Sequence, residues 1–179
     1  AGKADLKELT ADMGTMLNLD LAKALQMNPV PGVNIPAGQL SFAGRLASSK
    51  SDAGARQGID GSLTVSGLSG NAAGYAIDRF GTEITLAASV TDLKQLVVEK
   101  LNAPLTMAGQ SAGVIHVTAN ATLDGKTANA SVTTTNLNEN LFRPFLEPLL
   151  AGARLADARL DLNLNLAMTA DGKKTVKGD

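Results

Sequence analysis

The chain has 179 residues, of which 44% are hydrophobic and 18% charged, and its formal net charge is -1. This length suits one single-core domain or one segment of a longer β architecture, while the balanced charge lacks the positive field that binding to nucleic acid requires. Aromatic residues make up 3% and cysteine is absent, so the sequence predicts neither stacking platforms for bases or sugars nor disulfides, thiolate nucleophiles or sulfur-ligated zinc.

The N-terminal region, from Asp5 to Leu25, fits two patterns. Leu6, Leu9, Met13 and Leu17 have the spacing of a helix. Leu17, Leu19 and Leu21 instead alternate with polar or small residues as in a strand. Both interpretations stay open from the sequence.

From about residue 39 onward, apolar and polar residues alternate with a period of two, which is typical of strands with one apolar face. A sheet with such a face has to cover it by curling, with a second sheet, with helices or with a lipid-like ligand. We therefore predict a mainly β fold: an antiparallel, strongly curved sheet, trough-like or sandwich-like, with one or two short helices. The residues predicted to line the apolar groove are Leu40, Phe42, Leu63, Val65, Ile84, Leu86, Ile115, Val117, Leu160, Leu162, Leu164 and Leu166.

Turn and loop signals separate these strands. The Asp-Gly pairs at positions 124–125 and 171–172 predict tight hairpin turns, because both residue types tolerate positive φ. The polar stretch from Ser48 to Gln57 and the Gly-rich stretch from Gly67 to Gly74 predict loops. Pro104 lies in an apolar strand pattern, where it interrupts hydrogen bonding toward one neighbouring strand and indicates an edge or a bulge.

One segment has a helical pattern. Asn138 can cap the helix, Glu139 lies in its first turn, and leucines and phenylalanines then form an apolar stripe. Pro144 and Pro148 predict that the helix is short and broken before it ends near Leu150.

The sequence predicts no catalytic residue, cofactor or metal site. His116 falls on the polar face of a predicted strand, so a Ser-His-Asp relay or a multi-histidine metal site would have to be built around a surface residue. Gly125-Lys126-Thr127 resembles the end of a phosphate-binding loop, but Asn120 stands where that loop needs a glycine. A hairpin with an exposed Lys126 explains this motif better.

An internal repeat is visible at a shift of about 120 positions, which places Asn18 on Asn138 and Leu40 on Leu160. The match lies mainly in hydrophobic class, so shared alternation alone stays an open explanation. We predict residues 1–179 to be a single β-rich segment of a larger protein, with possible repeat units near residues 16–66 and 136–179.

The run from Asn136 to Leu150, followed by Gly152 and the alternating strand from Arg154 to Met168, resembles segments of the AsmA-like family of bacterial envelope proteins. In that family a short helix rich in leucine, phenylalanine and proline precedes paired strands of this kind. The stretch from Asn18 to Phe42 is similar.

The resemblance implies a non-catalytic module of the Gram-negative periplasm, tethered to the inner membrane by a segment outside this sequence. It further implies a role in outer-membrane biogenesis and in phospholipid movement between membranes. The expected partners are phospholipid or another acyl-chain lipid, together with inner- and outer-membrane proteins. The competing interpretation is a structural or adhesive β module of a bacterial surface protein. An enzyme would require His116 to be buried next to acidic groups.

Overall fold

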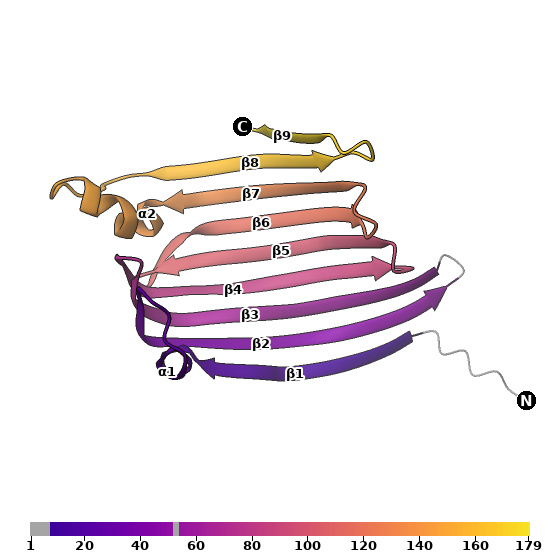
Figure 1. Ribbon diagram of the computed structural model, residues 1–179, viewed down its shortest axis with the longest axis horizontal. Coiled ribbons are helices and arrows are strands. Elements are labelled where there is room, and N and C mark those ends of the chain that lie inside the picture. The colour runs from indigo at the N-terminus through magenta and orange to yellow at the C-terminus, as the bar shows by residue number, and fades with distance from the viewer. Residues whose placement is uncertain (1–7, 52–53) are drawn as a thin grey trace, which may run out of the picture.

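The computed structural model describes residues 8–51 and 54–179, so the sequence predictions for residues 1–7 lie outside the described part. One nine-stranded antiparallel sheet contains all the strands, in sequence order (Figure 1). The strands are β1 (Glu8–Asp20), β2 (Val33–Ser51), β3 (Gly54–Ala72), β4 (Tyr75–Thr91), β5 (Gln95–Met107), β6 (Gln110–Thr122), β7 (Ala128–Asn138), β8 (Arg159–Met168) and β9 (Lys174–Gly178). The predicted mainly β, antiparallel fold is confirmed. The sheet is open, with β1 and β9 at opposite edges.

Two short helical segments lie at one end of this sheet. Helix α1 (Leu21–Met27) joins β1 to β2, while helix α2 (Glu139–Leu146) and the 3₁₀ helix η1 (Glu147–Leu149) join β7 to β8. Odd-numbered strands of an antiparallel meander all end on the same side, so α1 and α2 share that side (Figure 1).

The N-caps of the two helices follow from the sequence. The Asp20 side chain accepts a hydrogen bond from the amide of Lys23, and the Asn138 side chain accepts one from the amide of Asn140, both at 3.1 Å. The sequence left the N-terminal region open between a helix and a strand. Over the described residues it forms a strand up to Asp20, and a helix follows. The predicted break of the second helix is confirmed, because α2 gives way to a 3₁₀ turn that carries Pro148.

Helices α1 and α2 lie about 120 positions apart, which is the shift of the predicted internal repeat. The repeat itself stays a prediction.

The closed hydrophobic core is small and lies beneath α2. Leu105, Met107, Ala112 and Leu137 form a buried cluster, against which Phe80, Ile115, Leu141 and Phe142 pack. Strands β4 to β7 therefore meet the helix at one end of the sheet, and the helix covers that end only.

Two local predictions need correction. The described residues of the stretch from Ser48 to Gln57 lie in strands rather than in a loop, because β2 extends to Ser51 and β3 begins at Gly54. Near the start of β3 the Asp92 carboxylate accepts a hydrogen bond from the Ala55 amide at 2.8 Å. Most of the stretch from Gly67 to Gly74 is likewise in strand β3.

Pro104 lies in a central strand, which excludes the edge, while a register shift between Leu105 and Thr106 fits the alternative prediction of a bulge. The ladder between β4 and β5 has no residue pair at Pro104, whereas Pro104 pairs with Val114 of β6. The prediction that this proline interrupts pairing toward one neighbour is thus confirmed.

The sheet leaves an unusually large surface open to water. The accessible surface area of the chain is 11771 Å², whereas a compact monomeric protein of 18.3 kDa exposes about 8,100 Å². Of the predicted ways to cover the apolar face, a second packed sheet is not found among the described residues. In the same part of the chain, no helix is both long enough and apolar enough to span a bilayer.

Candidate functional site

Strand register aligns the apolar residues of successive strands into continuous rows. In the middle row Leu86 lies opposite Leu101, and the pairing then continues strand by strand. The row is Leu86, Leu101, Val117, Val132 and Leu164, from β4 to β8. Because residues directly opposite each other in a sheet point to the same face, these five side chains form one stripe perpendicular to the strands.

Two further rows run parallel to the middle row. An alanine-rich row crosses eight strands, and an outer row lies nearer the end away from the helices. The alanine-rich row is Leu46, Ile59, Ala88, Val98, Ala119, Ala130, Leu166 and Val176. The outer row is Val90, Leu96, Ala121, Ala128, Met168 and Lys174. We call the side of the sheet that carries these three rows the apolar face.

The structure brings all the sequence-predicted groove residues onto the apolar face. Leu40 pairs with Val65, and Leu63 pairs with both Phe42 and Ile84. Ile115 and Leu162 share one cross-strand partner on β7, so they lie on the same face. None of the predicted residues is buried: Leu160 and Leu166 are 38% and 39% exposed, and the others are half-buried. The apolar face is therefore continuous, but its side chains stay partly exposed to solvent.

Where glycines interrupt the apolar face, Phe42 covers them. A Cβ built on Gly44 would lie 3.1 Å from the Phe42 ring, and one built on Gly61 would lie 3.6 Å from it. Gly44 and Gly61 are cross-strand partners, so one aromatic ring shields exposed backbone on both β2 and β3.

The apolar face is hollowed near the C-terminal edge. A depression of about 320 Å³ is lined by Ala128 and Ala130 of β7, Leu166 and Met168 of β8, and Lys174 and Val176 of β9, together with the residues between them. The alanines form its floor because they fill less space than the leucines beside them.

The opposite face is polar. One of its rows reads Ser62, Thr85, Asn102, His116, Thr133 and Asn163. His116 is exposed, with Asn102 and Thr133 as its cross-strand neighbours. A shallow depression of about 620 Å³ on this side is lined by threonine, serine and asparagine together with apolar residues, Glu99 and Lys177. There Asn129 donates to Asn120 at 3.3 Å.

A bulge in β5 gives the polar face its main ionic contact. Between Val98 and Leu101 the register shifts, and Glu99 reaches the guanidinium of Arg56 and the hydroxyl of the buried Ser89. Arg56 also donates to the Ser89 hydroxyl at 3.2 Å. These three side chains tie β3, β4 and β5 together from the side opposite the apolar rows.

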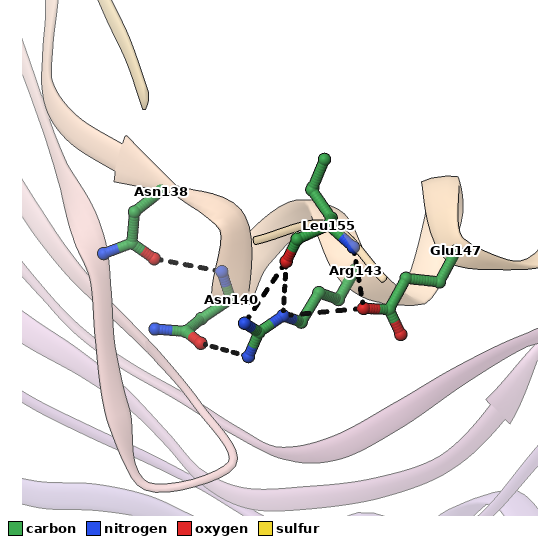
Figure 2. A network of polar contacts seen from close by, with 5 residues as sticks. All are labelled: Asn138, Asn140, Arg143, Glu147 and Leu155. Atoms are coloured by element: carbon green, nitrogen blue, oxygen red, sulfur yellow. Dashed lines mark hydrogen bonds and ion pairs between the residues drawn. The ribbon is translucent and has the colours of Figure 1, made fainter. Parts of the chain in front are cut away.

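A polar network fixes helix α2 to the segment that follows it (Figure 2). The Nη1 group of Arg143 donates to Asn140 Oδ1 at 3.1 Å, and its Nε and Nη2 groups donate to the carbonyl oxygen of Leu155 at 3.3 Å. Glu147 accepts the Leu155 amide at 3.3 Å and lies 3.6 Å from Arg143 Nε. The network leaves apolar side chains of the helical segment exposed, including Phe145, at 43%, and Leu149, at 77%.

Two hairpin turns repeat the pattern Thr-x-Asp-Gly-Lys at the far end of the sheet. In the first, a hydrogen bond from the Thr122 side chain, supported by the Lys126 amide, lowers the pKa of Asp124 to about 2. In the second, the Thr169 hydroxyl and then the Lys173 amide lower the pKa of Asp171. Both carboxylates thus serve as acceptors within their own turns.

The described residues contain no group of three or more His, Cys, Asp or Glu side chains placed to hold a metal ion. Sequence reasoning missed several members of the rows, notably Leu96, Val98 and Lys174. The change of spacing from Leu96 and Val98 to Leu101 was a readable signal, since a three-residue step between apolar positions of one face marks a bulge.

We compared the chain with protein-family models, with curated proteins and with solved structures, and none of them matches.

Proposed function

We propose that this chain is a non-catalytic AsmA-like segment of the bacterial envelope whose apolar face shields phospholipid acyl chains. The observation that carries the proposal is the middle row from Leu86 to Leu164, which runs unbroken over five strands and has no covering layer among the described residues. On this proposal the segment works in the periplasm, tethered to the inner membrane by another part of its protein, and supports outer-membrane assembly or lipid movement between the membranes.

The energetic argument is one of uncovered apolar area. Each Å² of apolar surface left in water forgoes roughly 25 cal/mol of stabilisation, and soluble proteins seldom keep a contiguous apolar patch above a few hundred Å² without using it. The face described here extends across all of β2 to β9. Acyl chains, being flexible and apolar, can cover such a surface without needing a specific pocket.

The polar face supports the same proposal from the other side. Its serine, threonine and asparagine rows suit contact with water, and the Arg56–Glu99 pair adds charge there. A sheet with one apolar face and one polar face can separate hydrocarbon from an aqueous compartment.

The test is native mass spectrometry of the chain purified from a bacterial envelope without exchange of bound lipid. We expect adducts whose masses match phospholipids. A triple variant, L86T/V117T/L164T, replaces three members of the middle row by polar residues that favour strands, and we expect it to lose most of the adduct. The matched control, T85S/T118S/N165S, changes neighbouring positions on the polar face and should keep it.

A spectrum free of lipid from the unmodified chain would contradict the proposal. It would favour the alternative, a structural or adhesive β module, for which the apolar face would contact another protein surface.

A further inference from the structure

Lys174 is the single charged side chain in the three rows of the apolar face. It lies opposite Met168 of β8, at the end of the outer row that begins with Val90 and Leu96. Every other member of these rows is apolar. A lysine in this position therefore brings an ammonium group to the border of a hydrocarbon-like surface.

The lysine borders the depression of about 320 Å³ described above, whose other lining side chains on this face are alanine, leucine, methionine and valine. The carboxylate of Asp171, in the adjoining turn, is held by the Thr169 hydroxyl and the Lys173 amide. That of Asp124, in the neighbouring turn, is paired with Lys126 at 3.2 Å. Within the described part of the chain, Lys174 has no ion pair of its own.

We infer that Lys174 binds the phosphate of a phospholipid whose acyl chain occupies the depression. The inference rests on the proposed function and adds to it a place and an orientation for the ligand. An apolar hollow ending at an ammonium group complements a molecule with a hydrocarbon chain and an anionic head, and a phosphate oxygen accepts a charge-assisted hydrogen bond from lysine.

A charged residue on the inner face of an edge strand can also serve to prevent edge-to-edge pairing of sheets. Since β9 is an edge strand of five residues, this second role has to be separated from the first by measurement. The two roles differ in what the removal of the charge changes: ligand affinity in one case, self-association in the other.

The experiment is isothermal titration calorimetry of the full chain with dodecyl phosphate, with dodecyl maltoside and with inorganic phosphate, each alkyl probe below its critical micelle concentration. The first variant, K174M, replaces the lysine by an unbranched apolar side chain of similar length and so removes the charge. The second, K174R, keeps the charge. K177M is the matched control, because Lys177 lies on the same strand but pairs with Asn165 on the polar face. Analytical ultracentrifugation of each variant reports self-association.

We expect dodecyl phosphate to bind K174M about fivefold to tenfold more weakly than the unmodified chain, the change typical of one lost charge-assisted hydrogen bond. K174R and K177M should bind it like the unmodified chain, and dodecyl maltoside should not distinguish any of the four proteins. Inorganic phosphate alone should bind far more weakly, because it lacks the chain that fills the depression.

Unchanged affinity of K174M for dodecyl phosphate, with dodecyl maltoside still bound, would overturn the inference while leaving the proposed function intact. If K174M self-associates while its affinity for dodecyl phosphate is unchanged, Lys174 protects the sheet edge, and the inference is overturned. If the unmodified chain binds inorganic phosphate as tightly as dodecyl phosphate, the site binds a free anion, and the inference is overturned as well. If neither alkyl probe binds the unmodified chain, the proposed function fails together with the inference.

Discussion

The guanidinium of Arg143 donates two hydrogen bonds, from Nε and from Nη2, to the carbonyl oxygen of Leu155, each at 3.3 Å. Arg143 lies in α2, whereas Leu155 lies in the irregular segment that leads to β8. This contact closes the long connection between β7 and β8, and it holds α2 over the only closed core among the described residues.

Replacing this arginine should loosen that end of the sheet. We predict that R143M lowers the free energy of unfolding by about 1–2 kcal/mol, since the Leu155 carbonyl loses its donors. Urea unfolding measures the loss, and hydrogen exchange at the Leu155 amide should accelerate. R154M serves as the control, because Arg154 is exposed; equal effects of the two variants would argue against a specific role of the network.

The two ends of the sheet should respond unequally to loss of a leucine. Leu105 is 8% exposed beneath α2, so L105A should cost about 2–4 kcal/mol of unfolding free energy. Leu164 is half-buried on the open face, and L164A should cost about 1 kcal/mol. Chemical denaturation of both variants compares them directly, and similar losses would mean that the apolar face is packed in solution.

The hairpin turns should make stability depend on acid. Because the pKa of Asp124 is lowered to about 2 and that of Asp171 is also lowered, their contributions are fully present above the unfolded-state value near 3.9 and are lost as the pH falls toward 2. In D124N this contribution is missing at every pH. We expect the difference in unfolding free energy between the native chain and D124N to shrink between about pH 4 and pH 2; a constant difference would show that the carboxylate charge is not involved.

Gly113 should tolerate no side chain. Its φ is +117°, and a Cβ there would lie 2.6 Å from the carbonyl oxygen of Asn136 and 2.7 Å from the Cα of Leu137. We predict that G113A lowers the unfolding free energy by about 2 kcal/mol or more, through backbone strain and displacement of β7. Thermal unfolding checks this. G109A serves as the control for backbone strain alone, because Gly109 has a φ of +79° but a Cβ there meets no atom within 4 Å, so G109A should cost less than G113A.

The sequence was sufficient to predict the strands with clear alternation and their apolar face, because alternation fixes which side of a strand each residue occupies. It also predicted the capped helix after Asn138 and the turn at Asp171-Gly172, where local chemistry decides the backbone. Strand order and register were not predictable, since Leu101 has the same local pattern whichever strand lies beside it. Pairing with Leu86 and Val117 becomes known only from the fold.

Polar segments were predicted least well. Ser48 and Gln57 carry no apolar signal, yet they pair with each other in the β2–β3 ladder, because backbone hydrogen bonds and the Asp92 cap of Ala55 hold the hairpin. Lys174 was missed for a related reason. In the run from Lys173 to Lys177 only Val176 is apolar, so the face of each lysine depends on the pairing of Lys174 with Met168.

Adjacent residues on one strand give the sharpest test of whether the apolar face meets lipid. Val117 belongs to the middle row, whereas Thr118, the next residue, pairs with Ser131 on the polar face. With a photoreactive benzophenone amino acid at either position, in the chain as it resides in a bacterial envelope, we expect cross-links to phospholipid from position 117 and none from position 118. Cross-links from position 118 alone, or from neither position, would contradict the proposal that this face shields acyl chains.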